Sequence, residues 1–280
     1  MPLGQKRFAW LASYPRSGNT WLRFLIKSLM QGGREIDINA PGSSTASANR
    51  NEFEELFGIE SSLLTDDEIN LSRPRLYRHI AARSNHTVIL RKVHDRCWRN
   101  SGGDRMFPAE LSRGVVYIVT DPRDVAVSYA HFAGVGIDEM IRRMGDPAMA
   151  VPTRRQHQSQ FFAQPFGTWS EHVLSWLDDS GMPLLSVRYE DLIADTAGEL
   201  TRVAAFLGLP SGAASEAAAA VRFEGLRAQE NQHGFRELLN PDTHFFRQGR
   251  AGAWRSALSA AQAERLENDH GDVMTRLGYS

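Results

Sequence analysis

The stretch that decides the fold runs from residue 8 to residue 30: Phe-Ala-Trp-Leu-Ala-Ser-Tyr-Pro-Arg-Ser-Gly-Asn-Thr-Trp-Leu-Arg-Phe-Leu-Ile-Lys-Ser-Leu-Met. Residues 8–13 form a short apolar run typical of a buried strand, and Pro15 ends the strand because it has no backbone N–H. From Asn19 onward apolar residues recur at helical spacing, until Gly32 and Gly33 indicate a helix end. The stretch predicts a strand, a tight turn and a helix.

The same pattern returns along the chain. Apolar runs at 87–90, 114–119 and 183–187 are typical of buried strands, and helical patterns follow from Asp124 and from about Leu192 to Leu207. Continuous apolar strands that alternate with amphipathic helices predict a parallel sheet with helices on both faces.

Three segments do not fit that core, near 36–64, 134–165 and 240–255, and 39–51 within the first is expected to be a loop. Ligands bind at the carboxyl ends of the strands of an open α/β sheet, and insertions there often cover the site. We expect these insertions to form acceptor and lid regions, although 134–165 is equally compatible with a solvated charged surface.

Composition excludes several classes of protein. The 280 residues carry 32 Lys and Arg against 33 Asp and Glu, so the basic footprint of a nucleic-acid-binding protein is missing. A single cysteine, Cys97, excludes a disulfide within this sequence and a cysteine zinc cluster. No run approaches the length of a membrane span, and no acidic metal cage is evident. We expect a cytoplasmic enzyme that uses no metal and binds neither nucleic acid nor membrane.

The turn after the first strand carries the residues of an anion site. A helix start presents unpaired N–H groups and the positive end of its dipole, Gly18 permits close backbone approach, and Arg16 adds a fixed charge. The ATPase pattern G-x-x-x-x-G-K-[ST] is absent. A plain turn capped by Ser17 or Asn19 is the alternative interpretation.

The segment Tyr-Pro-Arg-Ser-Gly-Asn-Thr-Trp at 14–21 resembles the 5′-phosphosulfate loop of the cytosolic sulfotransferase family. Five more segments resemble family motifs in the family's order: Lys-Val-His at 92–94, Asp-Pro-Arg-Asp-Val-Ala-Val-Ser-Tyr-Ala-His-Phe at 121–132, Gly-Thr-Trp-x-x-His-Val-x-x-Trp at 167–176, Tyr-Glu-Asp at 189–191 and Phe-Arg-Gln-Gly-Arg-Ala-Gly-Ala-Trp at 246–254. The resemblance covers most of the chain. It implies one domain over 1–280, an α/β, P-loop-kinase-like three-layer fold with a roughly five-stranded parallel sheet.

The resemblance also implies a function, the transfer of the sulfuryl group of 3′-phosphoadenosine 5′-phosphosulfate (PAPS) to a hydroxyl or amine of a small molecule. His94 is then the general base, Lys92 a second cation, and Arg16 the group that stabilises the bridging oxygen. An ordinary histidine, with a pKa near 6.5, is mostly neutral at cytoplasmic pH and therefore suits the role of base. The donor-binding positions implied are Arg16, Ser17, Gly18, Asn19, Thr20, Trp21, Ser128, Tyr189, Phe223, Arg247, Gln248 and Gly249. Among them the resemblance assigns Ser128, in the 121–132 motif, to the 3′-phosphate, and it assigns Trp21, Tyr189 and Phe223 to the neighbourhood of the adenine.

Two of these positions, and Thr120 beside them, depart from the family pattern. Arg16 and Gln248 stand where the family has lysine, and Thr120 stands where it has an arginine that grips the 3′-phosphate. Arg123, Arg247 and Arg250 are candidates to replace that arginine. A nucleotide kinase on the related fold and a catalytically silent nucleotide-binding protein remain the alternative functions.

The remaining polar and aromatic candidates are interpreted as structural. The histidines at 131, 157, 172 and 270 lack ligand spacing, and Trp169 and Trp176 indicate the core face of a helix. Residues 255–264 faintly resemble the family's dimer motif, with Glu264 identical, so a homodimer is a further hypothesis.

The identity of the acceptor is the least defined expectation. Aromatic residues and methionines of the first two insertions suit an apolar or partly anionic acceptor; they are Phe53, Phe57, Met140, Met144, Phe161 and Phe162.

Overall fold

The computed structural model describes residues 7–40, 45–151, 160–238 and 243–279. The chain forms two compact units. The first unit comprises the described parts of 1–14, 44–117 and 147–185, and the second those of 15–43, 118–146 and 186–280. The expectation of a single domain stays a prediction.

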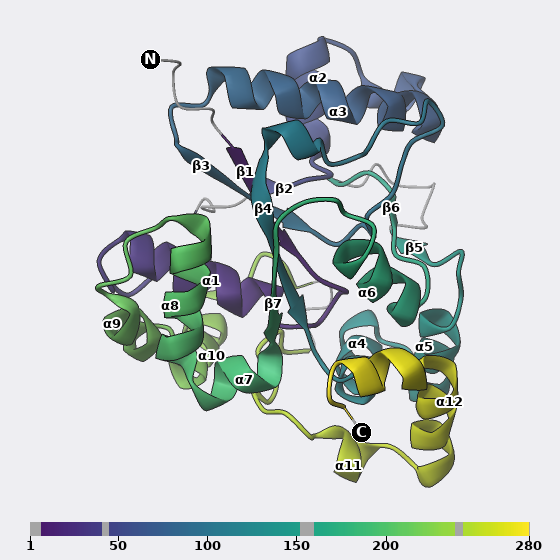
Figure 1. Ribbon diagram of the computed structural model, residues 1–280. Helices are drawn as coiled ribbons and strands as arrows, with labels where there is room; N and C mark the ends of the chain where they lie inside the picture. Colours follow the sequence, from purple (N-terminus) through teal and green to yellow (C-terminus); the bar gives the residue numbers. More distant parts are fainter. Residues whose placement is uncertain (1–6, 41–44, 152–159, 239–242, 280) are drawn as a thin grey trace. The chain divides into compact units, whose positions relative to one another are not determined.

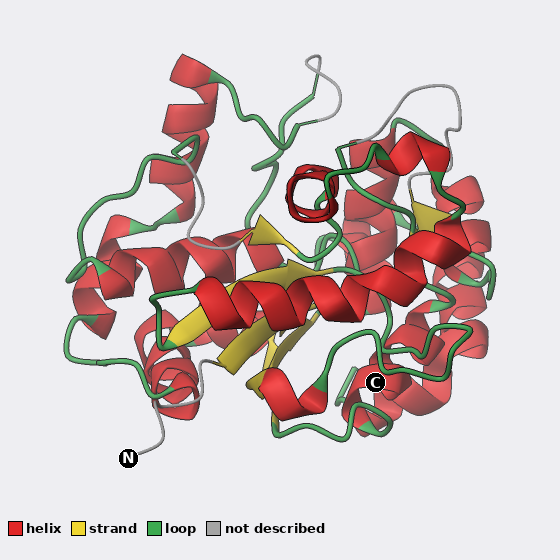
Figure 2. Cartoon of the chain, turned by 90° about the horizontal axis from the view of Figure 1, so that it is seen from above, coloured by secondary structure: helices red, strands yellow, loops and turns green. Residues whose placement is uncertain are grey.

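A five-stranded sheet has the order β2-β3-β1-β4-β7, and its strands lie side by side (Figure 2). The strands are β1 (Arg7–Ala12), β2 (Thr45–Ala46), β3 (Val88–Val93), β4 (Ser112–Val119) and β7 (Leu184–Arg188). β1 pairs in parallel with both β3 and β4, and β2 pairs in parallel with β3. The predicted α/β fold with a central parallel sheet flanked by helices is confirmed. The short strand β2 is a correction, because it lies in the segment 39–51 that we expected to be a loop.

The other elements of the first unit are α2 (Arg50–Phe57), η1 (Ser61–Leu63), α3 (Asp66–Arg83), η2 (Ala109–Leu111), α6 (Trp169–Leu177) and a two-stranded antiparallel sheet of β5 (Ala150–Val151) and β6 (Gln164–Pro165). The starts of α3 and α6 are fixed by capping boxes at Thr65 and Thr168, which satisfy N–H groups that a helix start leaves unpaired. An aromatic core fills this unit, and Trp10 lies at its centre, with its ring against those of Phe8, Tyr77 and Phe107.

The second unit is made mostly of helices: α1 (Asn19–Met30), α4 (Pro122–Ala133), α5 (Ile137–Met144), α7 (Tyr189–Ala194), α8 (Thr196–Leu207), α9 (Ala214–Ala220), α10 (Phe223–His233), α11 (Trp254–Ala257) and α12 (Ala260–Arg276). α1 packs against α8 and α9, and α4 against α5 and α12 (Figure 1). The helix expected at about 192–207 is two helices, because the Asp195 side chain accepts the Gly198 N–H and starts α8 anew.

The predicted insertions contain short elements rather than long loops. β2, α2 and η1 lie within 36–64, and α5, β5 and β6 lie within 134–165, while 152–159 and 240–242 lie outside the described residues. Among the helices that the structure describes, none is long and apolar enough to cross a membrane.

Candidate active site

The loop between β1 and α1 has the backbone of an anion site. Gly18 is the N-cap of α1 with φ 90°, and Arg16 is also left-handed, with φ 70°. No described side chain caps this helix, so its first N–H groups face the loop without the usual Ser or Asp partner. A Cβ on Gly18 would lie 2.5 Å from Cδ2 of Tyr189, so both the dihedral angle and the space require glycine.

Arg16 is bonded to Ser128, the residue predicted to bind the 3′-phosphate of the donor. Its Nε donates to Oγ of Ser128 at 3.2 Å, and its Nη2 donates to the Phe245 carbonyl at 3.0 Å. The guanidinium lies over the rings of both Phe132 and Phe245, 4.7 and 4.3 Å from their centroids, and the two rings meet edge-to-face. Burial lowers the pKa of Arg16 to about 10, so it remains charged at neutral pH.

Aromatic residues form a second wall beside Gly18. Trp21 meets Tyr189 edge-to-face, with 5.8 Å between ring centroids, and its Nε1 donates to the Val221 carbonyl at 2.9 Å. Burial raises the pKa of Tyr189 to about 12, which keeps it a neutral phenol. Two residues that the sequence assigned to adenine binding therefore lie together beside the phosphate loop.

The loop at 245–253, which leads into α11 and is called the late loop below, is held near its start by one face of α10. Glu230, which is buried, accepts the N–H groups of Phe245 and Phe246 at 2.6 and 3.0 Å. Arg227 donates to the carbonyls of Phe246 and Arg247 at 2.9 and 2.5 Å. The sequence analysis missed both residues, although their spacing of three places them on one helix face.

Phe223, from the same helix, covers Gly249 so closely that a Cβ there would lie 2.2 Å from its ring. Arg247 beside it is half-buried, and burial lowers its pKa, with a smaller contribution from Arg250. Gln248 is exposed. The structure thus brings Phe223 and Gly249 together and leaves Gln248 facing solvent, while their predicted roles in donor binding stay predictions.

Thr120 has a structural role in place of the family's arginine. It is buried, and its Oγ1 donates to the Ser17 carbonyl at 3.2 Å, so it holds the loop between β1 and α1, the phosphate loop, in place. A short polar side chain satisfies that carbonyl.

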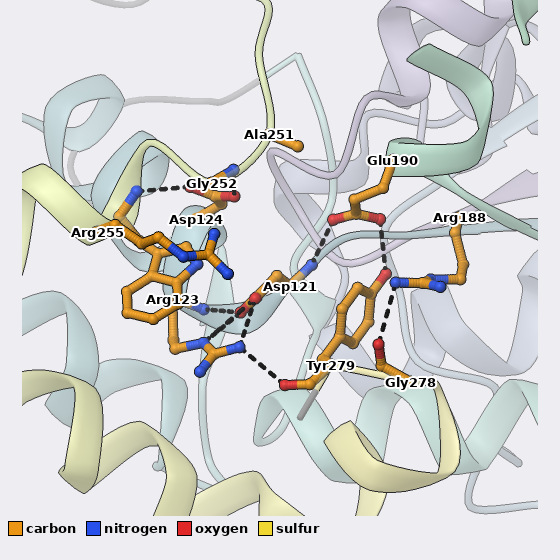
Figure 3. Close-up of a pocket in the computed structure, with 11 residues that line it drawn as sticks. Asp121, Arg123, Asp124, Arg188, Glu190, Ala251, Gly252, Arg255, Gly278 and Tyr279 are labelled. Carbon is orange, nitrogen blue, oxygen red and sulfur yellow. Dashed lines mark hydrogen bonds and ion pairs between the residues drawn. The ribbon is translucent and has the colours of Figure 1, made fainter. Parts of the chain in front are cut away.

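Arg123 does not supply the missing charge. Its guanidinium binds Asp121, with Nη2 to Oδ2 at 2.8 Å, and donates to the Tyr279 carbonyl (Figure 3). It also binds Glu267 at 2.6 Å and lies 4.0 Å from the centroid of the Trp254 ring. Asp121, Arg123, Trp254 and Tyr279 are among the residues that line a polar cavity of about 240 Å³. Because Arg123 is paired with Asp121 and Glu267, Arg247 and Arg250 are the remaining candidates for a 3′-phosphate contact, which stays a prediction.

Asp124 is a further residue that the sequence analysis missed. Its carboxylate accepts the N–H groups of Gly252 at 2.6 Å and Trp254 at 2.8 Å, which fixes the end of the late loop to the first turn of α4. The sequence feature that could have identified Asp124 is its place in the 121–132 motif, directly after Arg123.

The predicted catalytic pair, Lys92 and His94, lies in the first unit, at the end of β3. Nδ1 of His94 lies 2.9 Å from the Ser13 carbonyl oxygen. Oγ of Ser13 lies 3.3 Å from the same nitrogen and can accept as well as donate. The shorter contact is to the carbonyl, which only accepts, and it assigns the proton to Nδ1, so that Nε2 is the nitrogen able to take up a proton. This is the tautomer that a general base requires.

Several expectations about other residues are corrected or explained. Phe53, Met140 and Met144 have 1% of their surface exposed or less, so they are core residues and do not line an open acceptor site. Ser259, in the predicted dimer motif, forms the capping box of α12. Burial raises the pKa of Cys97 to about 11, consistent with an inert thiol.

A parallel α/β sheet whose first strand leads through Arg16 and Gly18 to a helix start without a side-chain cap is typical of nucleotide-binding proteins. The chain belongs to the sulfotransferase domain family, whose model matches residues 6–278. It is therefore a PAPS-dependent sulfotransferase, as the sequence predicted.

Curated relatives agree with this assignment. The chain is 25% identical over 274 residues to cytosolic sulfotransferase 1 of Danio rerio, covering 94% of this chain and 81% of the relative. It is 25% identical over 297 residues to sulfotransferase 1A1 of Canis lupus familiaris, covering 96% and 84%.

Solved structures show the same fold. A retinol dehydratase in complex with androsterone and the inactive cofactor PAP has a TM-score of 0.60 at 19% identity, covering 98% of this chain and 82% of that one. A mouse sulfotransferase complexed with PAP has a TM-score of 0.59 at 18% identity, covering 96% and 85%.

Proposed function

We propose that the second unit holds PAPS across the phosphate loop and the late loop, and that His94 activates a hydroxyl or amine of a small-molecule acceptor. The bond of 3.2 Å between Arg16 Nε and Ser128 Oγ is the observation that carries this proposal. It joins two motifs 112 residues apart, one assigned to the 5′-phosphosulfate and the other to the 3′-phosphate.

The residues present suit the donor. The first N–H groups of α1, with Ser17, Asn19 and Thr20, offer hydrogen bonds to a phosphosulfate, and Trp21, Tyr189 and Phe223 offer apolar surface to adenine. Arg247 and Arg250 of the late loop offer the positive charge for a 3′-phosphate. Ser128 adds a hydroxyl donor there.

In the proposed reaction the acceptor oxygen or nitrogen forms a bond to sulfur while the bond from sulfur to the bridging oxygen breaks. The acceptor's proton passes to Nε2 of His94, whose other nitrogen is held by Ser13. Negative charge collects on the leaving phosphate, where Arg16 and the start of α1 stabilise it. Lys92 serves as a second cation for the transferring group.

In this scheme arginine and lysine side chains are sufficient to stabilise the negative charge without a metal ion, because a transferring sulfuryl group carries less charge than a phosphoryl group. Within the described residues no group of three or more His, Cys, Asp or Glu could hold a metal ion. The absence of a metal stays a prediction, as does a homodimer. We also place the protein in the cytoplasm, which is supported by the name of the Danio rerio relative.

The test is transfer of labelled sulfate from PAPS to a panel of phenols, alcohols and amines in buffer containing EDTA. We expect transfer by the wild type, loss of at least about 100-fold in His94→Gln, as for a missing general base, and PAP binding that is unchanged by that substitution. Ser128→Ala is the donor-site counterpart, expected to weaken PAP binding. A preference for ATP with magnesium over PAP would overturn the proposal in favour of a kinase.

A further inference from the structure

Side chains of helix α6 form hydrogen bonds with the backbone of the segment that carries His94. Nε2 of His172 lies 2.9 Å from the His94 carbonyl oxygen, and Nε1 of Trp176 donates to the next carbonyl, that of Asp95, at 3.0 Å. Ser175, between them, accepts the Cys97 N–H at 2.9 Å. His172 and Trp176 are four residues apart, so one face of one helix meets successive carbonyls of one loop.

The protonation state of His172 follows from its surroundings. It is fully buried, and burial lowers its pKa to about 4, so it is neutral at physiological pH. Because its Nε2 faces a carbonyl, which only accepts, that nitrogen carries the proton. Nδ1 is then an acceptor, and the hydroxyl of Tyr117 donates to it at 2.9 Å.

These bonds close a ring around His94. The Tyr117 hydroxyl is also bonded by the backbone of Tyr14, and burial holds its pKa well above the ordinary value, so it stays a donor. The carbonyl oxygen of Ser13, the neighbour of Tyr14, accepts a hydrogen bond from Nδ1–H of His94. The ring runs from the Tyr14 backbone through Tyr117 and His172 to the His94 carbonyl, and from the His94 imidazole back to Ser13.

We propose that His172 is a positioning residue for the reaction. Tyr117 donates to Nδ1 of His172, and Nε2–H of His172 donates to the His94 carbonyl and so fixes the backbone of His94. The His94 imidazole then keeps its Nδ1–H tautomer and presents Nε2 to the acceptor. The proposal rests on the assignment of His94 as base. A histidine held by a fixed donor in this way has one orientation and one tautomer, which is the state that proton abstraction needs.

The first test reads the tautomers directly. Long-range ¹H–¹⁵N spectra of the ¹⁵N-labelled full chain separate the two nitrogens of each histidine, and His94→Gln and His172→Gln assign the two residues by loss of signal. We expect Nδ1–H for His94 and Nε2–H for His172 in the wild type. An Nε2–H tautomer at His94 would overturn the proposal.

The second test compares two substitutions of His172. Gln places an amide N–H near the position of Nε2 and retains the bond to the His94 carbonyl, whereas Leu removes it. We expect His172→Leu to lose about tenfold in kcat, with acceptor KM and PAP binding unchanged and with mixed tautomers at His94. His172→Gln should restore most of kcat and the single tautomer.

Phe107→Leu is the matched control, because Phe107 lies in the same aromatic core and its ring contacts those of Trp10 and Trp176. It should destabilise the fold while leaving kcat and the His94 tautomer as in the wild type. If His172→Leu behaves like this control, His172 is only a core residue and the proposal is wrong. If His94→Gln itself keeps wild-type kcat, the assignment of the base has failed, which is a different result.

Discussion

Two buried histidines should make this protein acid-sensitive in a measurable way. Burial lowers the pKa of both His172 and His270 from 6.5 to about 4. The folded state therefore stays unprotonated at these positions while the unfolded state binds protons. Stability is fully present above pH 6.5, is lost as the pH falls towards 4, and changes no further below that value.

The size of the effect follows from the shift. Each pKa unit corresponds to about 1.4 kcal/mol, so each histidine removes about 3 kcal/mol of stability over the whole window and about 2 kcal/mol between pH 7 and pH 5. His270→Gln should abolish the part of this acid-induced loss of stability that His270 causes. The variant is therefore expected to lose about 2 kcal/mol less than the wild type between pH 7 and pH 5.

Urea unfolding followed by tryptophan fluorescence, at half-unit steps from pH 7 to pH 5, measures this difference. Comparison of variant with wild type cancels the contribution of the carboxylates, which both proteins share. His86→Gln, at an exposed position, is the control and should reproduce the wild-type slope. Equal pH dependence in His270→Gln and the wild type would refute the reasoning.

Three substitutions test the donor site, with PAP affinity measured by calorimetry and stability by urea unfolding. Gly18→Ala should cost about 1–2 kcal/mol from the left-handed backbone alone and should weaken PAP binding, because the methyl group meets Tyr189; unchanged affinity would show that the loop does not hold the nucleotide. Thr120→Val removes the bond to the Ser17 carbonyl and should cost about 1 kcal/mol of stability, and no loss would mean that Thr120 is not a brace. Glu230→Gln leaves one of the two N–H groups of the late loop poorly paired and should weaken PAP binding more than it lowers stability; the opposite ranking would contradict a positioning role.

Much of the architecture was readable from local pattern. Four of the five strands of the parallel sheet and the first helix follow from apolar runs and spacing, because side-chain burial imposes a period that the sequence must carry. The short strand β2 could not be predicted, since its two residues pair only because β3 lies beside them. Asp195 could have been recognised as the cap that divides α7 from α8, as aspartate before a helix is a standard start signal.

The sequence by itself determined the family, the phosphate loop and the identity of the residues around it, because those depend on residue type and order. Only the tertiary structure decided what each charged or polar side chain is bonded to. It assigned Arg123 to Asp121 and Glu267, Thr120 to the Ser17 carbonyl, and His172, which the sequence left as a structural residue, to the carbonyl of His94. The physical reason is that a hydrogen bond joins atoms about 3 Å apart in space, whatever their separation along the chain, and no spacing within a motif records such a partner.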